Sequence, residues 1–507
     1  MTPRSTQWPA HCLNIPATKS SKIGEVDRPK TTNRNLWLVL AIYAAITGVL
    51  SLRHTMWRDE LQLWLYGYKS SNFAEFIQNR KAEIHPVGYQ LFTYIVSRVA
   101  SNPEILKLTN WIFSILMAVV ILFYTQLKIT YKILFLFGLI PLIGYSHIAE
   151  QYMPATLLFI LLLNLFSNSR NRVPFFTAAG VLANLHILFL LASIGFVVIY
   201  SIESFVMSKK ICQLLKSNNK LICLIALYLS SVILGLSLIS QTTAAGKVTG
   251  LTDLPHLLKR SLVVLGSACF PFVNFDFNGS NYSITSLFFI LLSVLVLTGL
   301  FYLAIKQNLK LGIAVVLSNS LVILAMVIGY SSYWWHFGVL FLTLFVSFVL
   351  LLQTQPMDKF DKFARQFLFG LLLMSQIIAL FIGPNTNLWE RRPYSTAEKT
   401  ASFLKENCDD TCTIIMNSQS AGTAISGYMN GRDIYYADIG QFGSFARWGL
   451  PSTEVTWDVM VSSAKRFKNP VLVTSELLRP PTGVLTIMSF SGAVWSDENF
   501  TVWRISP

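Results

Sequence analysis

The residues best placed to do chemistry lie in one polar stretch, Arg53 to Tyr89, between two apolar segments. Only 13 of the 25 acidic residues precede position 385, and four of these fall in this stretch: Asp59, Glu60, Glu75 and Glu83. A carboxylate held just above a bilayer and shielded by aromatic neighbours has a raised pKa and can take a proton from an attacking hydroxyl. Asp59 is therefore a candidate general base. The alternative is that Asp59 and Glu60 only favour the positive end of a helix dipole.

An amphipathic helix is predicted to position these carboxylates. Five apolar residues recur at helical spacing: Trp57, Leu61, Trp64, Leu65 and Tyr68. Such a stripe is typical of a helix lying along a membrane surface with its aromatic rings at headgroup depth. Asp59 would then point away from the membrane.

Further candidates lie at the ends of other apolar runs, where ionisable side chains at membrane depth are costly and usually functional or paired. His85 is suited to bind a phosphate or orient a carboxylate, but it can equally cap a span. Glu150 lies in the short turn Tyr145 to Tyr152, where a water-facing charge is the alternative. Five basic residues are candidates for neutralising a lipid phosphate: Lys247, Lys259, Arg260, Arg391 and Arg392. The alternative is that they belong to a solvated charged surface.

The motif Trp57-Arg58-Asp59-Glu60, followed by His85-Pro86 and Tyr89, resembles the first outer loop of the GT-C superfamily. These polytopic glycosyltransferases use sugars carried on polyprenyl phosphate. Protein O-mannosyltransferases and the aminoarabinose transferase of lipid A are members. The resemblance covers the whole chain in layout, and it implies that Asp59 and Glu60 are catalytic and that His85 binds substrate.

Two further loops are compared with the same family. Its second outer loop commonly reads Ala-Arg-x-Tyr, so Tyr152 matches, whereas Glu150 stands where the family has a phosphate-binding Arg. A carboxylate there repels phosphate and is suited instead to a sugar hydroxyl or a divalent cation. The run from Tyr330 to Gly338 is similar to a late outer loop of an uncharacterised bacterial branch, matching at His336 and Gly338, although its aromatics also fit an interface belt.

Composition places the chain among polytopic membrane proteins. Of 507 residues, 53% are hydrophobic and only 13% are charged, which excludes a soluble globular protein of this length. The net charge of +15 resides in residues 1 to 384, with 29 basic against 13 acidic residues. That excess fits loops on the inner face of a membrane and requires no nucleic acid partner.

Three regions are expected. Residues 1–35 are predicted to be a disordered cytoplasmic tail, residues 36–384 a transmembrane catalytic domain whose first outer loop is 53–86, and residues 385–507 a soluble extracytoplasmic domain. Eleven to thirteen spans are expected, with short runs at 87–100, 133–145 and 152–166, and a run at 174–206 broken near His186. One of the runs between 87 and 127 should not cross the membrane. Lys/Arg-rich connections place the N-terminus inside.

The last region predicts a small α/β domain. Helices are expected near 395–407, 421–428 and 455–468, and strands near 412–416, 433–437, 471–474, 484–488 and 494–505. It has no glycine-rich phosphate loop. Cys408 and Cys412, the one close cysteine pair, are either a local disulfide or two free thiols.

The resulting hypothesis is a mostly α, GT-C-type enzyme that moves a sugar from a polyprenyl-phosphate donor to an acceptor hydroxyl on a glycan, lipid or protein at the outer face. Asp59 would deprotonate the acceptor, and inversion would follow. Basic side chains, or a divalent metal ion shared by Asp59 and Glu150, would stabilise the leaving phosphate. The predicted substrate-binding residues are His85, Glu150, Tyr152, His336, Arg391 and Arg392.

Two other classes stay open. A lipid-linked oligosaccharide polymerase or ligase would carry Arg and His in a large outer loop between late spans and lack the α/β tail. A transporter would place ionisable residues within spans, beside Gly or Pro breaks. Because most of them lie at segment ends in this chain, transport is disfavoured.

Overall fold

The computed structural model describes residues 33–81, 83, 85–167, 172–206, 225, 227–233, 254–275, 283–329, 334–382, 392–447, 450, 452–475 and 480–505. Within the chain, Thr31–Pro507 form one compact unit. Several predictions lie outside the described residues: the tail up to residue 32, Lys247, residues 330–333 and Arg391.

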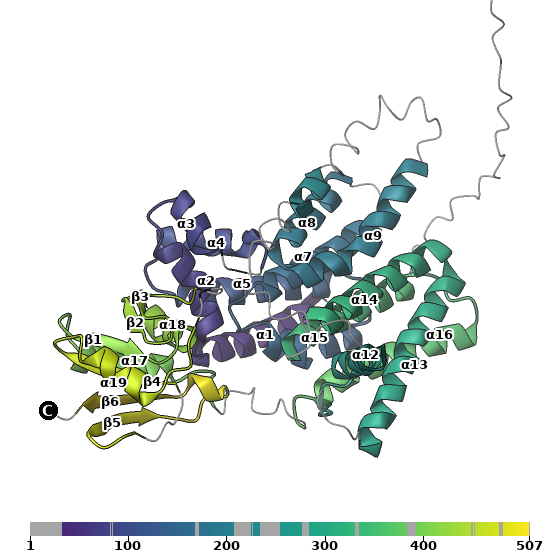
Figure 1. Cartoon of the computed structure of the whole chain (residues 1–507). Coiled ribbons are helices and arrows are strands. Elements are labelled where there is room, and N and C mark those ends of the chain that lie inside the picture. The colour runs from purple at the N-terminus through teal and green to yellow at the C-terminus, as the bar shows by residue number, and fades with distance from the viewer. Residues whose placement is uncertain are drawn as a thin grey trace, which may run out of the picture. The chain divides into compact units, whose positions relative to one another are not determined.

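Helices make up most of the described chain (Figure 1). Those before the last domain are α1 (Asn33–Arg53), α2 (Arg58–Tyr68), α3 (Phe73–Asn79), α4 (Val87–Val99), α5 (Ile105–Val119), α6 (Ile129–Leu136), α7 (Tyr152–Ser167), α8 (Arg172–Leu185), α9 (Ile187–Val206), α12 (Leu254–Cys269), α13 (Ile284–Gln307), α14 (Leu309–Gly329), α15 (Trp334–Gln353) and α16 (Lys359–Ile378). Two π-helical turns, η1 (Val120–Tyr124) and η2 (Ile140–Gly144), follow α5 and α6.

Five of the described helical segments are long and apolar enough to cross a membrane: Arg34–Arg53, Ile105–Tyr124, Ile284–Gln307, Leu309–Gly329 and Trp335–Gln353. Shorter apolar helices cover Tyr152–Phe166, Val173–Leu185 and Ile187–Ile202, so the predicted break at His186 is confirmed. With the composition, these segments make the chain an integral membrane protein. The total of eleven to thirteen spans stays a prediction.

Helix length bears on the expected non-crossing run between 87 and 127. α4 has 13 residues, about 20 Å of helix, which is shorter than a hydrocarbon core of about 30 Å. α5 and η1 together provide the 20-residue segment Ile105–Tyr124. The structure therefore favours α5 as the crossing helix and α4 as the partial one.

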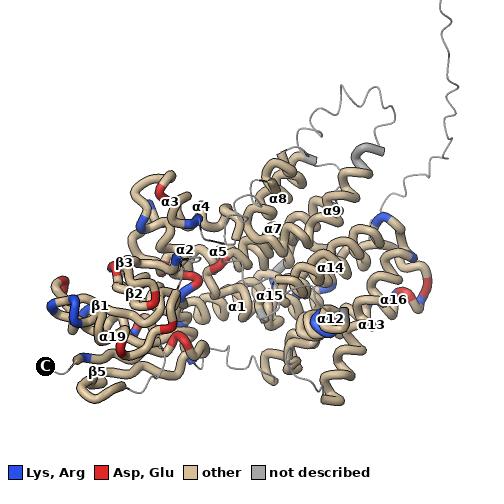
Figure 2. Tube along the Cα trace, in the orientation of Figure 1, with Lys and Arg blue, Asp and Glu red and all other residues tan. Residues whose placement is uncertain are grey.

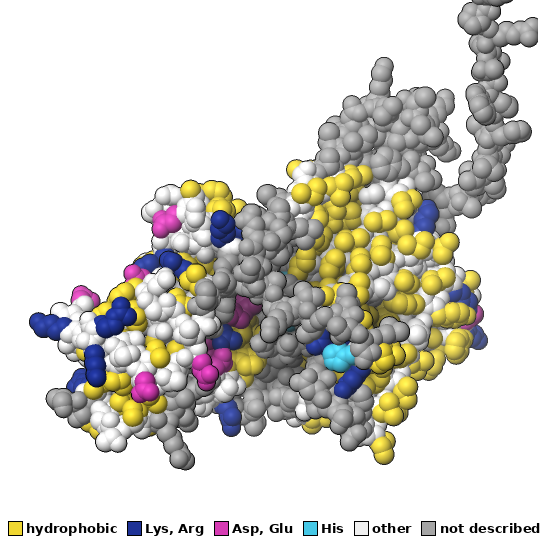
Figure 3. Space-filling view, viewed as in Figure 1, with side chains coloured by type: hydrophobic (Ala, Val, Ile, Leu, Met, Phe, Trp, Pro, Cys, Tyr) yellow, Lys and Arg dark blue, Asp and Glu magenta, His cyan; other side chains and the backbone are white. Residues whose placement is uncertain are grey.

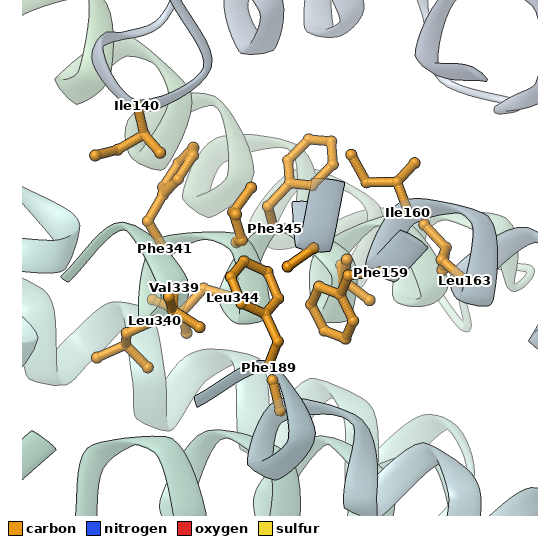
Figure 4. Packing of buried hydrophobic residues seen from close by; sticks show 14 of the residues in the cluster. Ile140, Phe159, Ile160, Leu163, Phe189, Val339, Leu340, Phe341, Leu344 and Phe345 are labelled. Carbon is orange, nitrogen blue, oxygen red and sulfur yellow. The ribbon is translucent and has the colours of Figure 1, made fainter. Parts of the chain in front are cut away.

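The helical part packs around α15. Phe341 and Phe345 of α15 belong to one buried cluster with Phe159 of α7 and Phe189 of α9 (Figure 4). On the surface, hydrophobic side chains spread over the region of α8, α9 and α14 (Figure 3). Exposed large apolar residues also line α1, α13 and α16, as expected for helices whose solvent is lipid.

The helix α12 was not expected from the sequence. α12 has Pro255, His256, Lys259 and Arg260 in its first turns, and these lower the hydropathy of the window. Its apolar residues nevertheless pack into the hydrophobic core of the helical part, where Val264, Leu265 and Cys269 are buried.

The C-terminal domain is a small α/β unit, as predicted. Its elements are α17 (Ala397–Asn407), β1 (Thr413–Met416), α18 (Gln419–Tyr428), β2 (Ile434–Tyr436), β3 (Gln441–Gly443), α19 (Trp457–Ala464), β4 (Pro470–Thr474), β5 (Val484–Phe490), a 3-10 turn η4 (Ser496–Glu498) and β6 (Phe500–Ile505). The expected last strand at 494–505 begins only at Phe500, and β3 was missed. Cys408 and Cys412 form a disulfide, which resolves the two alternatives.

The sheet has the strand order β3-β2-β1-β4-β6-β5, with β1 parallel to β2 and β4. Because side chains alternate along a strand, Ile414 and Met416 of β1 face the cluster that contains α17 and α18. Ile415 faces Met460 of α19 on the other side. The sheet is thus covered by helices on both faces.

The prediction that the stripe of α2 lies on the membrane surface is wrong. Trp57 is 3% exposed, and Leu61, Trp64 and Leu65 are fully buried. α2 instead packs between α4 and α18. A Cβ at Gly427 of α18 would lie 2.8 Å from Leu61 Cβ, so the glycine permits this close approach. Burial of each large side chain contributes about 1.5–3 kcal/mol, and the C-terminal domain thereby supplies the cover that the membrane was expected to supply.

Candidate active site around the start of α2

Charged residues are sparse along the membrane helices and concentrate around α2 to α4, in the C-terminal domain and at the start of α16 (Figure 2). The group around α2 contains the predicted catalytic residues. It is built from the end of α1, the loop before α4, the turn before α7 and the turn η4.

Glu60 links the start of α2 by hydrogen bonds to the end of α1 and to the turn before α7. Its side chain is fully buried, and Oε2 lies 2.7 Å from His54 Nε2 and accepts a hydrogen bond from the Trp57 backbone N–H (3.2 Å). Oε1 accepts from the Ala149 backbone N–H at 2.5 Å. Both carboxylate oxygens are thus engaged by three segments of chain, an arrangement suited to holding the site together.

The turn before α7 is positioned by side chains from α4 and α5. Asn110 Nδ2 donates to the carbonyls of Tyr145, Ser146 and Ile148 at 2.9–3.0 Å. Tyr89 Oη donates to the Ala149 carbonyl at 2.9 Å. This fixes the backbone that presents Glu150.

Glu150 lies beside Trp57, the aromatic residue that precedes α2. Its Oε1 accepts a hydrogen bond from Trp57 Nε1 at 3.2 Å, and the residue is 6% exposed. Burial, together with the nearby Asp59 and Glu60 carboxylates, raises the pKa of Glu150 well above its usual range. Glu150 therefore keeps its proton to a higher pH than an ordinary glutamate, and in the protonated form it can donate a hydrogen bond to an oxygen.

Asp59 differs from these two carboxylates because its side chain is 43% exposed. Its Oδ1 lies 3.5 Å from Arg58 Nε, outside hydrogen-bond range. Loss of hydrating water to the surrounding protein raises the pKa of Asp59 to about 6, a shift that Arg58 and His85 oppose and that Glu83 and Glu60 increase. The carboxylate is ionised at pH 7 and is a stronger base than an ordinary aspartate.

His85 is paired with a carboxylate that the sequence did not single out. Its Nδ1 lies 2.7 Å from Glu83 Oε1, and Tyr66 Oη donates to Glu83 Oε2 at 3.3 Å. The buried Arg80 donates from Nη2 to the His85 carbonyl at 2.9 Å. A glutamate on Nδ1 orients the ring and leaves Nε2 as its second functional atom.

Aromatic and imidazole rings connect His85 to the other predicted binding residues. The ring centroids are 5.5 Å apart for His85 and His186, 4.8 Å for Tyr152 and His186, and 6.2 Å for Tyr152 and His336. Tyr152 is buried and stacks on Tyr145. The sequence predicts a helix break at His186 but does not predict that this residue lies at the site. The signal that could have indicated it is an ionisable residue within an apolar run.

The C-terminal domain contributes residues that sequence reasoning missed. Arg58 Nη1 donates to Asp497 Oδ2, and the Arg58 backbone N–H lies 3.4 Å from Glu498 Oε1. Trp495 stacks on Trp57 with ring centroids 5.4 Å apart. These contacts join positions some 440 residues apart in the sequence, and no local pattern in either segment predicts them.

Glu498 is the deepest of these residues. It is fully buried, and Ser395 Oγ donates to its Oε2 at 2.6 Å. Burial raises the pKa of Glu498 to about 8, against smaller opposite effects of Ser395 and Arg58. At neutral pH it is therefore largely a neutral acid.

The predicted phosphate-binding cations are less closely gathered. Arg392 is exposed and lies two residues before Tyr394, whose ring packs on His54 with centroids 5.0 Å apart. Lys259 and Arg260 lie on α12, where Arg260 donates to the Val327 carbonyl at 3.2 Å. In the part of the chain that the structure describes, no three His, Cys, Asp or Glu side chains are grouped to hold a metal ion.

Comparisons with known proteins give one weak likeness. Neither the protein-family models nor the curated proteins contain a match to this chain. Among solved structures, the chain is similar to ArnT from Cupriavidus metallidurans, crystallised with undecaprenyl phosphate, at 10% identity over 93% of this chain and 98% of that chain, with a TM-score of 0.46.

Proposed function

We propose that this chain is a membrane glycosyltransferase of the GT-C type, which transfers a sugar from a polyprenyl-phosphate donor to an acceptor hydroxyl at the outer face of the membrane. The observation that carries the proposal is Asp59, a partly exposed carboxylate with a pKa of about 6, near Glu60, Glu150 and Glu498, whose side chains are buried and hydrogen-bonded. The motif from Trp57 to Glu60 with His85-Pro86 behind it supports the same assignment.

Asp59 acts as the general base in this mechanism. An Asp59 carboxylate oxygen takes the proton of the acceptor hydroxyl while the hydroxyl oxygen attacks the anomeric carbon. The bond from that carbon to the lipid phosphate oxygen breaks, and the phosphate leaves with the electron pair. Attack opposite the leaving group inverts the anomeric centre. General base catalysis of this kind contributes about 10²–10⁴ in rate.

The neighbouring residues have supporting roles in the proposal. Glu60, with both oxygens bonded, positions α2 rather than exchanging protons. Glu150, whose raised pKa favours its protonated form, donates a hydrogen bond to a sugar or phosphate oxygen. His85, oriented by Glu83, and Arg392 neutralise the departing phosphate, and the rings of Tyr152 and His336 border the sugar. No step is assigned to a metal ion.

The test is transfer of radiolabelled sugar from a panel of synthetic polyprenyl-phosphate sugars to acceptors in membrane extracts. Asp59→Asn should lower the rate at least 100-fold because the amide cannot accept the proton. Asp458→Asn is the matched control, since Asp458 also lies in the first turn of a helix but is exposed on α19. Equal rates for native protein and Asp59→Asn would remove Asp59 from its role.

A further inference from the structure

We propose that Asp497 of the C-terminal domain is a positioning residue of the active site, which holds the Arg58 guanidinium and so prevents Arg58 from pairing closely with Asp59. The inference rests on the proposed role of Asp59 as the base. It makes the C-terminal domain a part of the catalytic site.

Two carboxylates compete for one guanidinium. Arg58 Nη1 donates directly to Asp497 Oδ2, whereas Arg58 Nε and Asp59 Oδ1 are 3.5 Å apart. The guanidinium carbon also lies 5.6 Å from the centre of the Trp57 ring, which limits its movement. Arg58 therefore forms a direct hydrogen-bonded ion pair with Asp497 and a longer ion pair, at 3.5 Å, with Asp59.

Asp497 is itself held in place. It lies in the turn η4, whose next residue, Glu498, accepts hydrogen bonds from Ser395 Oγ (2.6 Å) and at its backbone carbonyl from Thr396 N–H (2.9 Å). The Glu498 carboxyl also receives the Arg58 backbone N–H. The turn η4 thus accepts hydrogen bonds from both the backbone and the side chain of Arg58, the first residue of α2.

The charges facing Asp59 come from every segment packed around it. Arg58 and His85 favour its ionised form, whereas Glu83 and Glu60 disfavour it. Glu150 and Glu498 also lie near Asp59, whose charge helps to raise the pKa of each of them. A guanidinium released from Asp497 would move toward Asp59 and stabilise its negative charge. The carboxylate would then take a proton less readily, so the contact with Asp497 keeps the base strong.

A second ion pair between α2 and the C-terminal domain provides a matched control. Lys69 Nζ, just beyond the end of α2, lies 3.1 Å from Asp433 Oδ1 and donates to the Gly431 carbonyl at 3.0 Å. Its two side chains are 32% and 56% exposed, compared with 19% and 41% for Arg58 and Asp497. Asp433 therefore helps to dock the domain without touching the base.

The experiment measures sugar transfer against pH for the native protein, Asp497→Asn, Arg58→Gln, Asp433→Asn and Asp59→Asn. Asp497→Asn should move the acidic limb of kcat/KM down by about one pH unit and lower the plateau rate, because a charge close to a carboxylate shifts its pKa by about 1–3. Arg58→Gln should move the limb up. Asp433→Asn should leave it in place, and Asp497→Glu, which restores the charge, should return it toward native.

The outcomes separate this inference from the proposed function. An unshifted limb in Asp497→Asn, with Asp59→Asn inactive, would overturn the role of Asp497 and leave the base assignment standing. An active Asp59→Asn would overturn both. If Asp497→Asn fails to fold, an unshifted or lowered limb in Arg58→Gln contradicts the inference by itself.

Discussion

Two groups of buried charge in this protein can be compared, one around Arg365 on α16 and one around Glu60 at the start of α2. Arg365 donates to both oxygens of Asp361, to Gln307 Oε1 and to the Leu351 and Thr354 oxygens, at 2.5–3.3 Å. One cation meets one carboxylate, and the rest of the guanidinium faces neutral acceptors. This group is balanced.

The group at α2 is not balanced. Carboxylates from four segments, namely Asp59, Glu60, Glu83, Glu150, Asp497 and Glu498, lie near two arginines, Arg58 and Arg80. Burial, together with the neighbouring carboxylates, raises the pKa of Asp59, Glu150 and Glu498, and of these three Asp59 is partly open to solvent. The comparison indicates that a balanced buried pair stabilises the fold, whereas an acidic excess creates proton affinity at the expense of stability.

The largest effect on stability is expected at the balanced group. Asp361→Asn leaves the buried Arg365 without its anion and also weakens the cap that Asp361 Oδ2 forms with the Met357 N–H at 2.8 Å. The free energy of unfolding should fall by about 3–5 kcal/mol. Thermal unfolding in detergent checks this.

Asp358→Asn, three residues earlier and exposed, is the control for that measurement. Asparagine caps a helix about as well as aspartate, so the cost should be below about 1 kcal/mol. Equal losses in the two variants would contradict the structural role of the Arg365 pair.

A smaller effect of opposite sign is expected at the acidic group. The pKa of Glu498 is about 8 in the fold against an ordinary value of 4.5, so ionising it costs folding free energy. That stability is fully present below pH 4.5 and is lost as pH rises through 8. Glu498→Gln removes the titrating group, and we expect it to gain about 1–2 kcal/mol over the native protein at pH 9 and little at pH 5. Urea unfolding at the two pH values measures this, and a constant difference between the proteins would contradict it.

Much of the fold could be predicted because it depends on local patterns. Apolar length marked the spans, and alternation of strands and helices marked the C-terminal domain. The break at His186 followed from a run too long for one helix. The helix α12 was not predicted because its charged first turns lower the mean hydropathy, although its later residues, such as Val264, are buried.

The candidate site could be predicted only in part. Asp59, Glu60 and His85 form a compact motif in the sequence, and Glu150, Tyr152 and His336 lie at the ends of apolar runs. The burial of Trp64 and Leu65 could not be predicted, because a stripe that fits a membrane surface fits a protein surface equally well. Asp497 and Glu498 reach α2 through tertiary packing, which leaves no trace in either segment.

The central claim is that Asp59 is both accessible and more basic than an ordinary aspartate, whereas Glu150 and Glu498, whose pKa values are also raised, are buried. Its most direct test is a titration of that carboxyl by infrared difference spectroscopy, native protein minus Asp59→Asn, between pH 3 and pH 9, which spans both the raised and the ordinary pKa. We expect a protonated carboxyl band, present only in the native protein, that disappears with a midpoint near pH 6. A midpoint near pH 4, the ordinary value for aspartate, would contradict the account.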